Sequence, residues 1–306
     1  MQMPTRLASA KARLIHPKLK LYKHRFLRLC LQSLTTLNFK MKFLINNSYL
    51  IALVVCFTAC EKVIDIKVHE SDTKYVVEGV ITNEPGSCYV YLSRTQPFNE
   101  DNNFEQVTGA VVKIKDNGQE TILAEAQPGV YKSAGLTGIP GHRYDLSVSI
   151  NNDLFTATCT MPPAVKLDTL YIAPGPFGQF QFATVAYTDL VGKNKYRFVQ
   201  YVNGNKDPEI FWENDEFTDG QKAVVQLDTG VDKKDDPRNI NSGDQVTIEM
   251  LGIDEAVYKY WFSLQSGGGD GGGNSAAPAN PVTNIKGGAL GYFSAQTIDR
   301  RIVIAP

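Results

Sequence analysis

The sequence predicts an all-β protein made of two β-sandwich domains in tandem, with one helix in the second domain. Short segments in which apolar and polar residues alternate recur about every ten residues, with turn residues between them, which is typical of antiparallel sandwiches. Only one segment has helical periodicity. The consecutive prolines Pro162 and Pro163 interrupt the pattern and mark the boundary between the domains.

The strands of the first domain, residues 74–162, follow from this alternation. In the clearest of them, Tyr144, Leu146 and Val148 alternate with polar residues, which predicts one buried face and one solvated face. The turn residues 151–153 tolerate a left-handed backbone and predict a hairpin to the next strand. The expected strands are 75–82, 88–94, 110–115, 120–126, 129–133, 143–150 and 154–161.

The second domain, residues 163–306, continues the pattern and contains the helix. Asp254 can cap a helix over about residues 254–265, because apolar residues that include Val257 and Trp261 recur on one helical face. The glycine-rich loop 267–280 follows this helix instead of preceding one, so it does not have the context of a phosphate-binding loop. The expected strands are 169–173, 179–187, 195–203, 223–228, 245–253, 289–294 and 301–305.

Residues 41–59 have the order of a bacterial lipoprotein signal peptide. Lys42 provides the basic start, and the following apolar run is shorter than the roughly 20 residues needed to span a bilayer. Small residues then precede Cys60. We expect processing before Cys60, lipid attachment to its sulfur and amine, and an anchor linker over residues 60–73. An ordinary cleaved signal followed by an incidental cysteine is the alternative.

Residues 1–40 contain nine Lys or Arg and no acidic residue. Because a second Met-Lys start occurs at position 41, we interpret this segment as an N-terminal extension from a start codon assigned too early. A basic arm for nucleic acid or anionic lipid is the alternative. Without residues 1–59, the chain keeps 21 basic and 32 acidic residues, a formal charge of −11. Such an acidic chain argues against a nucleic-acid partner.

No group of residues in the sequence indicates catalysis or metal binding. After processing only His69 and His142 remain, and neither has a recognisable nucleophile context. Asp215 and Asp219 have the spacing of a calcium loop, but Phe217 occupies a position that requires an oxygen ligand. We therefore expect no catalytic residue, no metal and no cofactor.

Two cysteines and four phenylalanines remain as candidates for other roles. Cys88 and Cys159 lie at inward-facing strand positions, where they form either a disulfide or two free buried thiols. The phenylalanines flank polar or proline-rich turns, where rings can stack on a sugar or peptide ligand or can close the ends of the sandwiches. These residues are Phe98, Phe104, Phe177 and Phe180.

Motifs along most of the chain after residue 60 resemble DUF4249, a lipoprotein family of Bacteroidetes. The most specific motif is the closing run 280–293, which ends in Gly-Gly-Ala-Leu-Gly-Tyr-Phe. The first half also resembles the carboxypeptidase-regulatory-like, transthyretin-like sandwich, an Ig-like arrangement. The other motifs are 60–66, 75–82, 107–114, 128–131, 140–144, 194–198 and 243–248.

The family resemblance implies a lipoprotein anchored in the outer membrane, on the cell surface or on the periplasmic face, and associated with a TonB-dependent transporter. It implies no reaction. We therefore expect a non-enzymatic binding or accessory component whose partners are the membrane, the transporter and a glycan or peptide ligand. A hydrolase acting on glycans or peptides, which would need paired carboxylates in a cleft, and a passive structural protein of the envelope are the alternatives.

Overall fold

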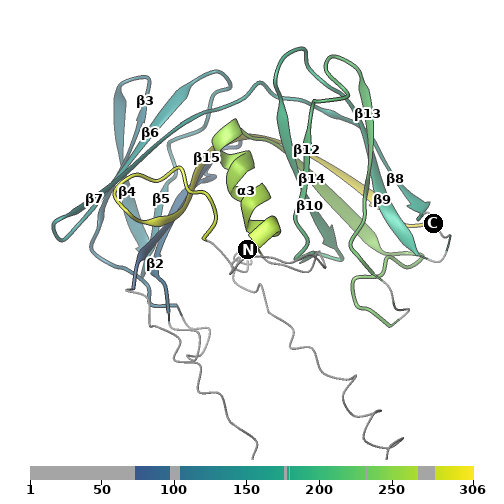
Figure 1. The fold of residues 1–306 in the computed structure, drawn as a ribbon, viewed down its shortest axis with the longest axis horizontal. Coiled ribbons are helices and arrows are strands. Elements are labelled where there is room, and N and C mark those ends of the chain that lie inside the picture. Colours follow the sequence, from purple (N-terminus) through teal and green to yellow (C-terminus); the bar gives the residue numbers. More distant parts are fainter. Residues whose placement is uncertain are drawn as a thin grey trace, which may run out of the picture. The chain divides into compact units, whose positions relative to one another are not determined.

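The computed structural model describes residues 73–306 except 97–103, 176–177, 179, 232, 234 and 268–279. The lipid-attachment residue Cys60 and most of the glycine-rich loop therefore lie outside the described residues. The described residues belong to one compact unit and are mostly β, with one helix (Figure 1). None of the described helices is long and apolar enough to cross a membrane.

The first half of the unit contains seven strands, and the second half contains eight strands and the helix. The first-half strands are β1 (Tyr75–Thr82), β2 (Cys88–Arg94), β3 (Val111–Asp116), β4 (Gln119–Gln127), β5 (Val130–Ser133), β6 (Arg143–Ile150) and β7 (Asp153–Thr160). The second-half elements are β8 (Leu167–Pro174), β9 (Gln181–Thr188), β10 (Lys195–Val202), β11 (Asn205–Lys206), β12 (Phe211–Asn214), β13 (Lys222–Leu227), β14 (Gln245–Gly252), α3 (Glu255–Gly267) and β15 (Leu290–Ile304).

These strands form one large mixed sheet and one small sheet. The large sheet has 12 strands in the order β11-β10-β14-β15-β1-β2-β5-β4-β3-β6-β7, with β12 paired to β10. Its pairings are antiparallel except for that of β1 with β15. The small sheet has the order β13-β9-β8.

The last strand, β15, differs from the sequence prediction. Residues 289–294 and 301–305 were expected as two strands, but β15 is one strand of 15 residues. Its first part pairs with β1 and its second part with β14, so it passes from one half to the other (Figure 1). The strand β15 thus pairs with strands on both sides of the boundary expected at Met161–Pro163. Between the two expected strands, Asp299 accepts a hydrogen bond from the Leu167 amide at 2.9 Å and remains within the sheet.

Two hydrophobic cores lie in the two halves. The first is built mainly from β1, β2, β3, β6 and β7, and Phe293 and Ala295 of β15 complete it. The second lies between the small sheet and strands β10 and β14, where Tyr187 and Phe198 are fully buried and their ring centroids lie 6.0 Å apart. Because β15 contributes to both cores, the halves are linked by packing as well as by pairing.

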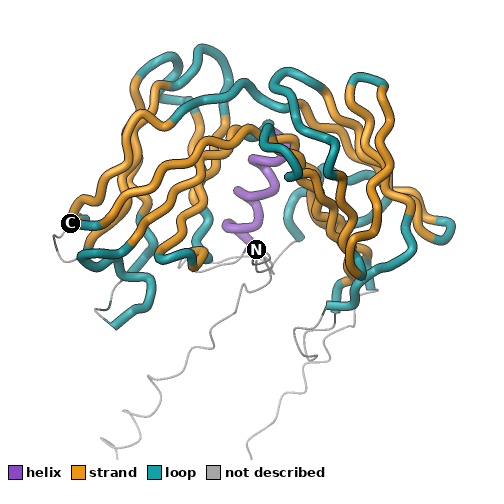
Figure 2. Tube along the Cα trace, turned by 180° about the vertical axis from the view of Figure 1, so that it is seen from behind, coloured by secondary structure: helices purple, strands orange, loops and turns teal. Residues whose placement is uncertain are grey.

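The helix α3 lies on the inner side of the large sheet, which curves around it (Figures 1 and 2). The predicted cap is confirmed, since Asp254 Oδ1 accepts a hydrogen bond from the Val257 amide at 2.9 Å. Val257 and Trp261 are buried against the sheet. The face of the sheet beside α3 is the inner face considered below.

Candidate functional site

A pocket of about 230 Å³ lies on the inner face of the large sheet. Its side chains come from six strands, which are β1 and β2 of the first half and β10, β11, β14 and β15 of the second, and from the turn between β1 and β2. The pairing of β15 with β1 brings the two halves of this wall together. Two lining residues, Arg197 and Tyr292, also contact Trp261 of α3, so the helix borders the pocket.

Arg197 of β10 is the most unusual group in the pocket wall. The residue is 7% exposed, and its guanidinium lies 3.8 Å from the centroid of the Trp261 ring. Its Nε has no hydrogen-bond partner, and none of the ion pairs in the described part of the chain involves Arg197. Burial lowers the pKa of this guanidinium. A buried charge without an ion pair is costly even when it stacks on an aromatic ring, which makes Arg197 a candidate ligand-binding group.

Lys206 of β11 is a second positive group in the pocket wall. Burial, followed by the nearby charge of Arg197, lowers the pKa of Lys206 to about 8. Two cations therefore share a partly desolvated wall, where each makes the charge of the other less favourable.

Two carboxylates in the wall already have a cationic partner. Arg300 Nη2 lies 2.7 Å from Glu249 Oε1, and Arg300 Nη1 lies 3.2 Å from Glu84 Oε1. The Tyr201 hydroxyl donates a further hydrogen bond to Glu249 Oε2 at 3.3 Å. The Arg300 guanidinium bridges these two carboxylates, so they are not a pair placed across an open space as in a glycosidase.

Aromatic rings form much of the remaining wall. Tyr89 and Tyr91 project from β2 with their ring centroids 4.9 Å apart. Tyr292 of β15 lies 4.8 Å from Tyr260 and 5.1 Å from Trp261, measured between ring centroids. Burial raises the pKa of Tyr89 and of Tyr292, so these phenols stay neutral at neutral pH. The pocket thus offers ring faces and neutral hydroxyls beside its charged groups.

The structure describes two of the four candidate phenylalanines, Phe104 and Phe180, and places them away from this pocket. Phe104 lies near β2 and β5, where its carbonyl accepts a hydrogen bond from Gln106 Nε2. Phe180 lies in the connection between β8 and β9. Neither lines the pocket, and Phe98 and Phe177 lie outside the described residues.

The candidate cysteines are free in the structure and both are buried. Of the two predicted alternatives, the structure thus has the two thiols and not the disulfide. Burial raises the pKa of Cys88 to about 12, and the pKa of Cys159 is raised further by burial and by Asp254. Cys159 Sγ accepts a hydrogen bond from the Ala295 amide at 3.1 Å. His142, whose Nδ1 lies 2.7 Å from Asp116 Oδ1, does not contact either thiol. We therefore assign both cysteines to packing.

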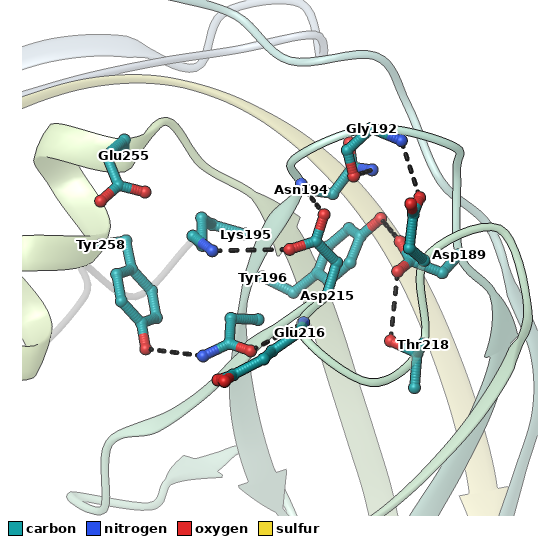
Figure 3. Close-up of polar contacts among 12 residues, drawn as sticks. Asp189, Gly192, Asn194, Lys195, Tyr196, Asp215, Glu216, Thr218, Glu255 and Tyr258 are labelled. Atoms are coloured by element: carbon teal, nitrogen blue, oxygen red, sulfur yellow. Dashed lines mark hydrogen bonds and ion pairs between the residues drawn. The ribbon is translucent and has the colours of Figure 1, made fainter.

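A cluster of acidic residues between β9 and β13 holds two loops together (Figure 3). Asp215 Oδ2 accepts a hydrogen bond from the Asn194 amide at 2.7 Å, and Lys195 Nζ lies 3.6 Å from Asp215 Oδ1. Asp219 Oδ1 accepts a hydrogen bond from the Gly192 amide at 2.8 Å. Among the residues that the structure describes, no three His, Cys, Asp or Glu residues are grouped to hold a metal ion. The calcium-like spacing of Asp215 and Asp219 therefore serves loop structure here.

The described chain is thus a mostly β protein with one helix. It combines a large mixed sheet, which carries the pocket, with a small sheet. Residues 61–302 match the family model described as Domain of unknown function (DUF4249), and the chain belongs to this family. No curated protein matches the chain.

Three solved structures show distant similarity. The FN1–FN3 domains of chicken CNTN1 are 11% identical with a TM-score of 0.19, over 58% of this chain and 60% of that one. A suggested carbohydrate binding protein from Bacteroides uniformis is 8% identical with a TM-score of 0.19, over 58% and 88%. The chicken interferon gamma receptor alpha chain is 8% identical with a TM-score of 0.18, over 59% and 88%. Similarity this low assigns no function.

Proposed function

We propose that this chain is a non-enzymatic binding protein of the bacterial cell envelope and that the inner-face pocket is its ligand site. The observation that carries the proposal is Arg197, a buried guanidinium at the pocket wall without a hydrogen bond to Nε or an ion pair in the described chain. Folding alone gains little from such a group, because no ion pair offsets its desolvation and the Trp261 ring contacts only one face of the guanidinium. A ligand that supplies the partner accounts for its presence.

The location of the protein is a second part of the proposal. The order of signal, small residues and Cys60 supports a lipid anchor, and the family resemblance supports an outer-membrane lipoprotein of Bacteroidetes that works beside a TonB-dependent transporter. The separate resemblance of the first half to the carboxypeptidase-regulatory-like sandwich supports an Ig-like or transthyretin-like arrangement there. The acidic composition after residue 59 suits a chain that works outside the cytoplasm without nucleic acid.

The bridging position of Arg300 favours binding over hydrolysis at this pocket. A glycosidase needs two carboxyl groups on either side of the bond that breaks, about 5 to 10 Å apart with substrate between them. Here Arg300 bridges Glu84 and Glu249 with ion pairs of 3.2 and 2.7 Å. Both carboxylates are thus already paired with the same guanidinium.

The ligand site is tested by screening glycans and peptides for thermal stabilisation of the purified chain. A ligand of the pocket should raise the melting temperature of the wild type and of Arg143→Gln, a control on an exposed arginine of β6 that is paired with Asp145. It should not stabilise Tyr91→Ala, which removes a pocket ring. A ligand that stabilises all three proteins equally binds elsewhere and counts against the site.

The anchor and the transporter are tested in the native envelope. Cys60→Ala should move the protein from the membrane fraction to the soluble fraction, and retention in membranes at high salt would count against the lipid. A pull-down in mild detergent through a C-terminal tag should recover one TonB-dependent transporter in near-stoichiometric amount. Recovery of the chain alone would refute a stable accessory complex.

A further inference from the structure

The donors of Arg197 are held in a defined plane but are not used within the described chain. The stacking distance of 3.8 Å to the Trp261 ring centroid covers one face of the guanidinium. Trp261 is 1% exposed, so its ring cannot move aside without disturbing the core. Stacking on an aromatic ring leaves the in-plane N–H groups of an arginine available, and their fork matches the two oxygens of a carboxylate.

The charges around Arg197 favour a negative ligand group. Lys206 adds a second positive charge to the same wall, and the charge of Arg197 contributes, after burial, to the lowered pKa of Lys206. Glu249 is already paired with Arg300. Glu78 also lines the pocket from β1, and its charge partly counteracts the lowering of the Lys206 pKa. An arriving carboxylate would thus relieve the repulsion between the two cations.

The pocket volume limits the size of the ligand group that enters. At about 230 Å³ it is below the range of roughly 300 to 1,000 Å³ that is common for drug-sized ligands. A single sugar acid or amino acid is therefore a more suitable occupant than an oligosaccharide. The rings of Tyr89 and Tyr91 would contact the body of such a ligand.

From these contacts we propose, resting on the function proposed above, that the pocket binds a small carboxylate-bearing ligand, either a sugar acid or an amino acid. Arg197 binds the carboxylate through its in-plane N–H groups, and Trp261 positions the guanidinium.

The proposal is tested by calorimetry on the full chain purified in detergent, with probes that differ only in the acid group. The pairs are glucuronate and glucose, galacturonate and galactose, and N-acetylglycine and N-acetylglycinamide. At least one acid should bind about tenfold or more tightly than its neutral partner, as expected for charge-assisted hydrogen bonds. Arg197→Met should remove this preference, and Arg143→Gln should keep it.

Folding of the variants is checked in the same samples. Because Arg197 is buried without an ion pair, Arg197→Met should keep the wild-type melting temperature or raise it by about 2 to 4 °C. Arg197→Lys keeps the charge but loses the planar fork, so it should weaken binding of the acid by about fivefold or more while the protein stays folded.

Three outcomes would overturn the carboxylate proposal. These are equal binding of acids and neutral partners, unchanged acid binding by Arg197→Lys and Arg197→Met, and no binding of any acid. Stabilisation by a neutral glycan or peptide that is lost in Tyr91→Ala would leave the pocket as a binding site and refute only the ligand class.

Discussion

Gly291 of β15 and Val77 of β1 face each other where the first and last strands pair, and a Cβ on Gly291 would lie 2.1 Å from the Val77 carbonyl oxygen. Gly291 also has a φ of +97°, a conformation that residues with a side chain rarely adopt. Both features require glycine at this position. The parallel pairing that joins the two halves therefore depends on it.

Gly291→Ala should destabilise the protein by about 3 kcal/mol or more, because it combines backbone strain with a clash against Val77. Gly288→Ala is the matched control, since Gly288 has a φ of +93° and nothing within 4 Å of an added Cβ. The control should cost only the strain, about 1 to 2 kcal/mol. Urea unfolding of both variants gives the difference, and equal losses would show that the close approach to Val77 is unimportant.

The first half should not fold cooperatively as the fragment 74–162. Without β15 the fragment lacks Phe293 and Ala295, which are fully buried in the first core, and leaves one edge of β1 without a partner. Thermal melting followed by near-UV circular dichroism should show no sharp transition. A fragment that melts as sharply as the full chain would support the division into two domains at residue 162.

Cys88 and Cys159 should resist alkylation in the folded protein. Both thiols are buried, and burial raises the pKa of Cys88 to about 12, so almost no thiolate exists at pH 8. Iodoacetamide should modify both residues only after unfolding in denaturant, without any reductant, as read by peptide mass spectrometry. A requirement for reductant would reveal the disulfide alternative.

The stability of the protein should depend on Lys206 above pH 8. Burial lowers the pKa of Lys206 to about 8 from an ordinary value near 10.5, with Arg197 of β10, Glu249 of β14 and Glu78 of β1 as the charged neighbours. The folded chain thus binds this proton more weakly than the unfolded chain, so the free energy of unfolding rises with pH between about 8 and 10.5. We expect a rise of about 1 to 2 kcal/mol, reduced from the full linkage value because the ammonium is partly exposed.

Lys206→Met is the comparison for this linkage. The variant should lack the contribution of Lys206 to the rise, whereas the tyrosines of both proteins titrate alike. Denaturant unfolding at pH 7, 8, 9 and 10 measures the difference between the two slopes. Parallel slopes would mean that the ammonium is fully solvated in the folded protein.

The local alternation of apolar and polar residues predicted most of the strands but not their long-range pairing. Residues 143–150 were predicted correctly as β6, because alternation within one strand reports directly on its two faces. β15 was predicted as two strands, because the sequence does not show that one strand pairs first with β1 and then with β14. The two short strands β11 and β12 were missed, since two to four residues are too few for periodicity to be visible.

The candidate site was harder to predict for the same reason. Its wall combines every second residue of strands that are far apart in the sequence, and only the sheet order brings them together. One signal was present: Arg197 occupies a strand position between Tyr196 and Phe198, where burial on both faces would be expected. A charged residue at such a position is a useful indication of a site. The candidate phenylalanines were selected because they flank turns, whereas the pocket lies on a sheet face.

The parallel pairing of β1 with β15 also determines when folding of the first half can be completed. The edge of β1 is covered only when Val76 pairs with Leu290. Closure of a very long loop therefore precedes completion of the first core. During synthesis or passage across a membrane, the nascent chain therefore presents an open sheet edge until its last residues emerge. Folding should be slow, and a chain released early should be prone to proteolysis and aggregation.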